Sequence, residues 1–102
     1  MDRLPLEFHP DARIETIQAF DWYADRSQQA AIAFQEELQN AGCAIQQSPE
    51  LWAYYLFGTR RYLMKRYPFV IVYRLVTDRI EIIAVAHGKR KPGYWKQRLD
   101  DE

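Results

Sequence analysis

Residues 69–86 read FVIVYRLVTDRIEIIAVA, and this stretch decides the fold. Its first run, residues 69–76, is rich in β-branched and aromatic side chains, which are typical of a central strand. Residues 77–79 (TDR) turn the chain. Its second run, residues 80–86, is apolar at both odd and even positions except for Glu81, which indicates a strand covered on both faces. The sequence therefore predicts two long strands at the heart of a sheet.

Two more strands are predicted on either side of this stretch. Residues 60–67 alternate loosely between polar and apolar side chains and end at Pro68. Near the N-terminus, apolar and polar residues alternate with the period of a strand that has one buried face. Its apolar positions are Leu4, Leu6 and Phe8. Pro5 lacks a backbone N–H, so we expect that position to be unpaired in the sheet.

A first helix is predicted to begin at His9-Pro10-Asp11. Proline fits the first position of a helix, and the acidic Asp11 and Glu15 suit the positive end of the helix dipole. Apolar residues at spacings of three and four predict the face that packs on the sheet. They are Ile14, Ile17, Phe20 and Ala24.

A second helix is predicted to follow at once, with Ser27 as its N-cap. Gly42 costs this helix about 1 kcal/mol relative to alanine, and Ser48-Pro49 ends it. Its apolar stripe comprises Ala30, Phe34, Leu38, Ala41 and Ile45. Because the connection between the two helices is so short, we expect an antiparallel helical hairpin.

These elements predict one α+β domain over residues 1–102, in the order β-α-α-β-β-β. The helical hairpin is expected to pack on one face of a mostly antiparallel four-stranded sheet. Hydrophobic residues make up 48% and charged residues 27% of the chain, which is a globular composition.

Several classes of protein are disfavoured by the composition. Arg74 interrupts the longest apolar stretch, so no membrane-spanning helix is expected, and the N-terminus lacks the apolar core of a signal peptide. One cysteine, Cys43, allows no internal disulfide and suggests a reducing compartment. With only two histidines besides, a structural metal site is not expected. We therefore expect a cytoplasmic protein without metal, membrane or small-molecule cofactor.

Charge is distributed unevenly along the chain, although the net charge is zero. Residues 1–56 contain 3 basic and 9 acidic side chains, whereas residues 57–99 contain 11 basic and 2 acidic ones. A basic block of this kind indicates an anionic partner, such as nucleic acid or an acidic protein surface. The alternative is that a strand-rich half carries Lys and Arg on its solvated face.

The densest cluster of chemically active side chains lies in residues 87–98, HGKRKPGYWKQR. Metal-free cleavage of RNA needs an acid and a base, which His87 or Tyr94 can supply, and cations for the phosphate, such as Arg90 or Lys65. The alternative is that these cations are solvated while the aromatic residues close the end of the sheet. Binding of an anionic or acidic partner is the better supported of the functional interpretations.

The chain from Arg60 to Arg98 resembles the RelE/ParE superfamily of bacterial toxins. The similarity lies in the basic strand, in the YPFVIVY and IEIIAVAH strands, and in the R-x-P-x-YW-x-x-R ending from Arg90 to Arg98. The upstream segments FHPDARIE and SPELW fit the same pattern. The resemblance implies the β-α-α-β-β-β toxin fold and the toxin half of a type II toxin–antitoxin module, a class also described as plasmid stabilisation proteins.

The resemblance leaves three functions open. A ParE-like toxin would inhibit DNA gyrase by binding, through Lys89, Arg90, Lys91, Tyr94, Trp95, Arg98 and Arg61. A RelE-like toxin would cleave mRNA on the ribosome, with His87, Arg90, Tyr94 and Lys65 as catalytic residues. Val70 stands where the RelE-like pattern has an arginine, which argues against cleavage. The third function is a non-toxic binding module on the same fold.

All three functions imply a cognate antitoxin, which in this superfamily folds over the toxin. Aromatic side chains bury a large area at low entropic cost, so they are candidate anchors for such a partner. We expect Trp22, Trp52 and Tyr55 to contact the antitoxin, with ordinary core packing as the alternative for each.

Overall fold

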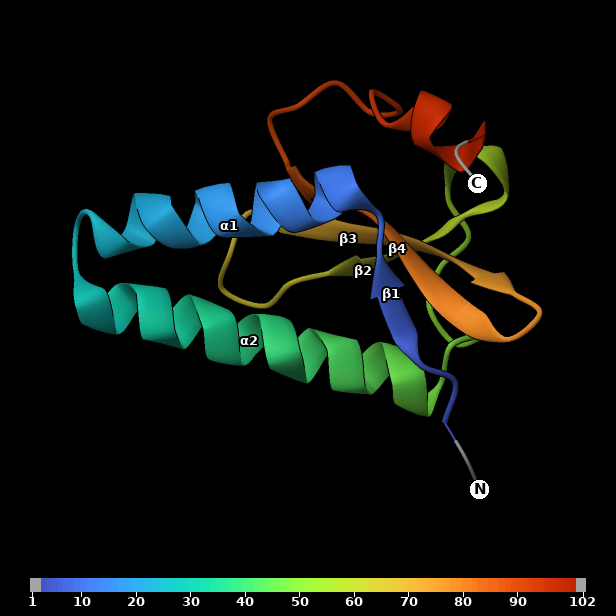
Figure 1. The fold of residues 1–102 in the computed structure, drawn as a ribbon, viewed down its shortest axis with the longest axis horizontal. Coiled ribbons are helices and arrows are strands. Elements are labelled where there is room, and N and C mark those ends of the chain that lie inside the picture. Colours follow the sequence, from blue (N-terminus) through green and yellow to red (C-terminus); the bar gives the residue numbers. More distant parts are fainter. Residues whose placement is uncertain (1–2, 101–102) are drawn as a thin grey trace.

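The computed structural model describes residues 3–100 and confirms the predicted order of elements (Figure 1). Two antiparallel helices lie against one face of a four-stranded sheet, so the chain is an α+β protein. The strands and helices are β1 (Leu6–Phe8), α1 (Pro10–Ala24), α2 (Gln28–Gln47), β2 (Arg60–Leu63), β3 (Phe69–Val76) and β4 (Arg79–His87). Two short 3₁₀ helices are added, η1 (Leu56–Gly58) and η2 (Lys96–Asp100).

The strand order in the sheet is β1-β4-β3-β2, which makes β4 a central strand. β4 pairs antiparallel with β3 and parallel with β1, but β1 reaches only from Ile80 to Ile82. Beyond Ile82, no strand of residues 3–100 therefore lies beside the edge of β4 that faced β1. The register with β3 also shifts at this point, because Val72 pairs with Ala84 and Tyr73 with Ile82, leaving Ile83 as an extra residue in β4.

β2 is shorter than the predicted strand over residues 60–67. It ends at Leu63, and Lys65 and Arg66 form a turn instead. Arg66 has a φ of 69°, a left-handed conformation that does not continue a strand. The backbone N–H of Met64 donates to the carbonyl of Phe69 at 3.0 Å, which closes the turn into β3.

Both helices begin where the sequence predicts. Pro10 is the first residue of α1, and the side chain of His9 accepts a hydrogen bond from the N–H of Asp11. The hydroxyl of Ser27 caps α2 by accepting from the N–H of Ala30 at 3.2 Å. Each cap satisfies an N–H that the first turn of a helix leaves without a partner.

The face of α1 that packs on the sheet differs from the prediction. Ile14 and Ile17 are 50% and 53% exposed, whereas Ala12 and Ala19 are buried. The predicted stripe through Ile14 and Ile17 was therefore wrong. Ala12 and Ala19 occupy the inner face, where their small side chains allow α1 to pack on β4, and the helical period then places Ile14 and Ile17 away from the sheet.

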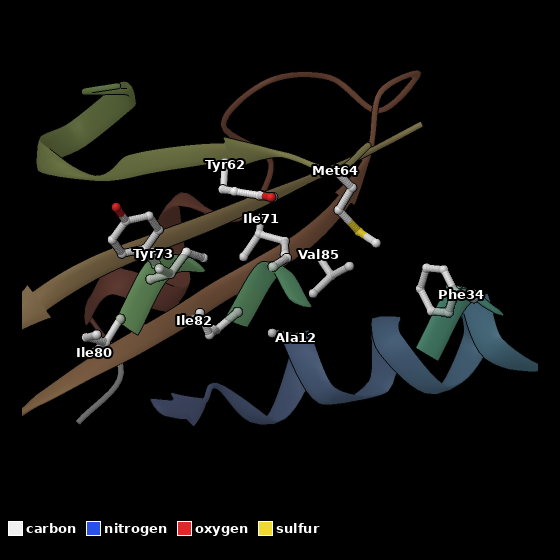
Figure 2. Close-up of a cluster of buried hydrophobic side chains, with 12 residues drawn as sticks. Ala12, Phe34, Tyr62, Met64, Ile71, Tyr73, Ile80, Ile82 and Val85 are labelled. Carbon is white, nitrogen blue, oxygen red and sulfur yellow. The ribbon is translucent and has the colours of Figure 1, made fainter. Parts of the chain in front are cut away.

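The predicted stripe of α2 is confirmed, with Phe34, Ala41 and Ile45 buried. Figure 2 shows Phe34 at one end of the cluster of β3 and β4 side chains that fills the space between the helices and the sheet. Gly42 lies where α2 meets β1, since a Cβ there would be 3.0 Å from Leu6 Cδ1. The absence of a side chain at Gly42 therefore allows α2 to contact Leu6, and this contact offsets the low helix propensity of glycine.

The second face of the sheet is covered by the C-terminal segment and by residues 54–58, so β4 is covered on both faces, as predicted. Trp95 lies at the centre of this layer and is 1% exposed. The rings of Tyr55 and Phe57 lie within 6.0 Å of its ring, measured between centroids. Val72, Ile83, Ala84 and Ala86 form the sheet side of the same cluster.

Candidate functional site

The segment after β4 is a folded loop. The N–H of Gly88 donates to the carbonyl of Pro68 at 2.7 Å, and the N–H of Arg90 donates to the carbonyl of His87 at 2.9 Å. Gly93 has a φ of 86°, and a Cβ there would lie 3.3 Å from Phe57 Cε2. This backbone presents three consecutive exposed cations, Lys89, Arg90 and Lys91, which we call the basic loop.

A buried ion pair between Glu15 and Arg98 fastens the end of this segment. Arg98 Nη2 lies 2.9 Å from Glu15 Oε2, and Nη1 donates to both Glu15 Oε1 and the carbonyl of Ile83 at 3.0 Å. Glu15 Oε1 also accepts the N–H of Val85 at 2.9 Å. Both side chains thus form hydrogen bonds to the backbone of β4 beyond the end of β1. They satisfy the carbonyl of Ile83 and the N–H of Val85, which a longer β1 would have paired.

Tyr94 joins this arrangement through its hydroxyl, which donates to Glu15 Oε2 at 2.5 Å. Burial, together with the hydrogen bond to the Glu15 carboxylate, raises the pKa of Tyr94 well above its usual value. The phenol is therefore held in its protonated form. The guanidinium of Arg90 lies 3.7 Å from the centroid of the Tyr94 ring, on the solvent side.

A pocket of about 330 Å³ lies between α1 and the basic loop, and we call it the loop pocket. His87 lines it and contacts the ring of Phe69 edge-on at 5.3 Å between centroids. His87 Nδ1 accepts the N–H of Lys89, so in the neutral ring Nε2 carries the proton. The other lining residues include Glu15, Trp22, Arg90 and Tyr94.

Three of the four residues predicted for RNA cleavage share this pocket. They are His87, Arg90 and Tyr94. Lys65 is exposed in the turn after β2 and does not line the pocket. The hydroxyl of Tyr94 is engaged by Glu15, an arrangement that suits a structural phenol better than an acid–base catalyst.

The residues predicted to bind the target occupy different environments. The three cations of the basic loop are exposed and Tyr94 is half-buried. Trp95 is buried, and so is Arg98, which is 7% exposed, so both fasten the segment and offer little surface to a partner. Arg61 lies on β2 with its guanidinium 4.8 Å from the ring of Tyr55, on the sheet face that the C-terminal segment covers.

The residues predicted to anchor an antitoxin do not form one surface. Trp22 is 52% exposed near the end of α1. Trp52 is half-buried at the opposite end of the helical pair, where its Nε1 donates to the carbonyl of Ala44 and its ring packs on Tyr62. Tyr55 packs against Trp95 on the other face of the sheet.

Glu15 is the central residue that sequence reasoning missed. The sequence suggested only that its charge suits the beginning of a helix. Its spacing from Ala12 and Ala19, three and four residues, places it on the same inner face of α1. A carboxylate between two small residues was the available signal, but the apolar stripe over Ile14 and Ile17 concealed it.

Residues 3–100 contain no cluster of three His, Cys, Asp or Glu side chains that could hold a metal ion. Within the same range, neither helix has the length and apolar character needed to cross a membrane.

A family model of the ParE toxin of the type II toxin–antitoxin system parDE matches residues 6–92. The chain belongs to the ParE toxin family. A solved structure described as the chromosomal ParDE TA system from P. aeruginosa shares the fold, with a TM-score of 0.72 and 20% sequence identity. That match covers 83% of this chain and 96% of the other. No curated protein sequence matches this chain significantly.

Membership of the ParE family confirms the predicted resemblance to the RelE/ParE superfamily and the toxin fold. The family match ends before Tyr94, Trp95 and Arg98. Of the side chains that fasten the C-terminal segment to α1 and β4, those of the segment itself therefore lie outside the matched region, whereas Glu15 lies within it. In this ParE-family chain they decide how the basic loop is presented.

Proposed function

We propose that this chain is a toxin that inhibits DNA gyrase by direct contact and is neutralised by a cognate antitoxin. The observation that carries the proposal is the basic loop: Lys89, Arg90 and Lys91 are exposed, and buried Trp95 and Arg98 fix the chain that follows them. A fixed cationic surface favours contact with an acidic patch of another protein, because little conformational freedom is lost on binding. Since gyrase is a cytoplasmic enzyme, we place the chain in the cytoplasm.

The antitoxin is proposed to cover the groove that α1 and α2 form together with β1. This groove measures about 690 Å³ and is lined by Leu6, Phe8, Ile17, Phe20, Leu38 and Cys43, among others. Exposed apolar surface of this kind is typical of a protein interface. An amphipathic segment laid into such a groove would bury Ile17, which α1 turns away from the sheet.

Ribosome-dependent cleavage of mRNA is the second candidate. It is favoured by one observation, the shared lining of the loop pocket by His87, Arg90 and Tyr94. It is disfavoured by the exposed position of Lys65 away from that pocket and by the hydrogen bond that occupies the Tyr94 hydroxyl.

A supercoiling assay with purified gyrase tests the proposal. The wild-type chain should inhibit the reaction, and the charge reversal Lys89→Glu with Lys91→Glu should abolish inhibition. The matched control is Lys65→Glu with Arg66→Glu, which reverses two exposed charges in the turn after β2 and should inhibit like the wild type. Absence of inhibition by the wild-type chain at micromolar excess would refute gyrase as the target.

A translation assay with reporter mRNA separates the second candidate from the first. Cleavage of the mRNA by the wild-type chain but not by the His87→Ala variant would support the endonuclease. Unimpaired growth of bacteria that express the chain without an antitoxin would favour a non-toxic binding module over both.

A further inference from the structure

The loop pocket has the size and lining of a site for one large apolar side chain. Its volume of about 330 Å³ lies at the lower end of the range for ligand sites. Trp22 and Tyr23 of α1, Phe69 of β3 and Tyr94 supply aromatic walls. Their arrangement leaves an apolar cavity open to solvent beside the basic loop.

The floor of the pocket offers no free charge to a ligand. Glu15 is the acidic residue in its lining, and both of its oxygens are engaged, by Arg98, Tyr94 and the N–H of Val85. A charged or strongly polar group on this floor would lose its hydration without gaining a partner. Glu15 therefore favours an apolar group beside it, and the polar residues of the lining besides Arg90 and Tyr94 include Gln18 and His87.

The rim of the pocket is cationic. The guanidinium of Arg90 is held over the Tyr94 ring at 3.7 Å, and that of Arg26 is held over the Trp22 ring at 3.5 Å. Lys89 and Lys91 flank Arg90 on the exposed loop. Stacking on a ring fixes each guanidinium and leaves N–H groups at its edge for carboxylates, although Nη1 of Arg26 already donates to the carbonyl of Trp22 at 2.8 Å.

We infer that the loop pocket receives one large apolar side chain of an acidic peptide segment in a protein partner, whose carboxylates pair with the cations of the rim. This inference rests on the proposal that the partner is a protein, but it does not require gyrase. A single open pocket with aromatic walls fits a nucleic acid less well, since a strand is bound by repeated phosphate contacts and by polar base edges.

Titration of the isotope-labelled chain by NMR tests the inference. The probe is a short synthetic peptide of Glu and Asp with one central Phe. It should shift the amide signals of residues 89–94 and the indole signal of Trp22. Two control peptides, one with Ser in place of Phe and one with Lys in place of each acid, should bind at least about tenfold more weakly.

Two variants with the same change of charge sharpen the test. Arg90→Glu should weaken binding of the acidic Phe peptide by at least about tenfold. The control is Lys96→Glu on the same segment, because Lys96 contacts the ring of Phe57 and does not line the pocket. The affinity of this variant for the acidic Phe peptide should stay within about twofold of the wild type. The dispersion of each variant's spectrum verifies that it is folded.

Equal binding of the Phe and Ser peptides, or equal losses for the two variants, would overturn the inference. So would stronger shifts of the same signals by a short oligouridylate than by the acidic Phe peptide. A chain that binds the Phe peptide as expected but leaves gyrase active refutes only the gyrase proposal. A chain that inhibits gyrase but does not bind the peptide refutes only this inference.

Discussion

Glu15 and Arg98 form a buried ion pair across 83 positions of the chain, with Oε2 and Nη2 2.9 Å apart. The pair does more than neutralise two charges. Through Glu15 it accepts the N–H of Val85, and through Arg98 it donates to the carbonyl of Ile83, so the end of the chain is bonded to the part of the β4 edge that β1 does not pair. The position of the basic loop depends on this connection.

Glu15→Gln is expected to lower the free energy of unfolding by about 3 kcal/mol, because it leaves the buried Arg98 guanidinium with only the exposed Asp11, 3.8 Å from Nε, as a counter-charge. The matched control is Glu7→Gln, which breaks the pair with Arg79 at the surface and should cost less than about 1 kcal/mol. Urea denaturation of the three chains gives both differences. Equal losses for the two variants would show that burial does not strengthen the pair.

Tyr94→Phe removes the hydroxyl that donates to Glu15. The expected loss is about 1.5–3 kcal/mol, the usual range for a hydrogen bond to a charged group. The ring remains to support Arg90, so the basic loop should keep its place. Urea denaturation measures the loss, and unchanged amide shifts for residues 89–91 would verify that the loop has not moved.

Alkaline solution is expected to destabilise the fold through buried phenols. Burial raises the pKa of Tyr73 to about 12 and also raises that of Tyr94. The unfolded phenols lose their protons near pH 10 while the folded ones keep them, so stability is complete below pH 10 and falls as the pH rises above it.

The loss of stability above pH 10 should be smaller in Tyr73→Phe, because this variant lacks the phenol that titrates. In the wild type, the Tyr73 hydroxyl donates to the carbonyl of Pro49. Denaturation at a series of alkaline pH values measures it, and the ultraviolet absorbance of phenolate reports the titration directly. A fall of equal steepness in Tyr73→Phe and wild type would contradict the assignment to this residue.

Gly93→Ala should destabilise the chain by about 1–2 kcal/mol, because the left-handed backbone disfavours a side chain. The new methyl group would also crowd the ring of Phe57. Gly88→Ala is the control, since a Cβ there makes an ordinary contact of 3.5 Å with the carbonyl of Pro68. Thermal melting compares the two, and similar losses would rule out the conformational explanation.

Ile17→Ala should leave the free energy of unfolding within about 0.5 kcal/mol of the wild type, because the side chain is largely exposed. If the antitoxin covers the groove between α1 and α2, its affinity should fall by about tenfold. Ile32→Ala removes an equally exposed isoleucine that does not line the groove, so it should bind normally. Calorimetry with the proposed cognate antitoxin provides the measurement.

Much of the fold followed from local patterns in the sequence. The order of elements, the caps at His9 and Ser27, the stripe of α2 and the bounds of β3 were predicted from adjacent residues, because capping and periodicity act within a few positions. The exposed cations of the basic loop and the half-buried ring of Tyr94 also lie in one predicted segment. The toxin family was also recognisable from the sequence, because its characteristic segments follow one another in a fixed order along the chain.

The inner face of α1 and the role of Glu15 were decided only by the tertiary structure. β1 is too short to pair with the whole of β4, so an edge remained whose backbone groups needed partners from elsewhere in the chain. Two alanines let α1 come near enough for the carboxylate of Glu15 to supply one partner, and Arg98 supplied the other. The pairing of Glu15 with Arg98 depends on which backbone groups of β4 remain without partners after the elements have packed. No local pattern in the sequence predicts this.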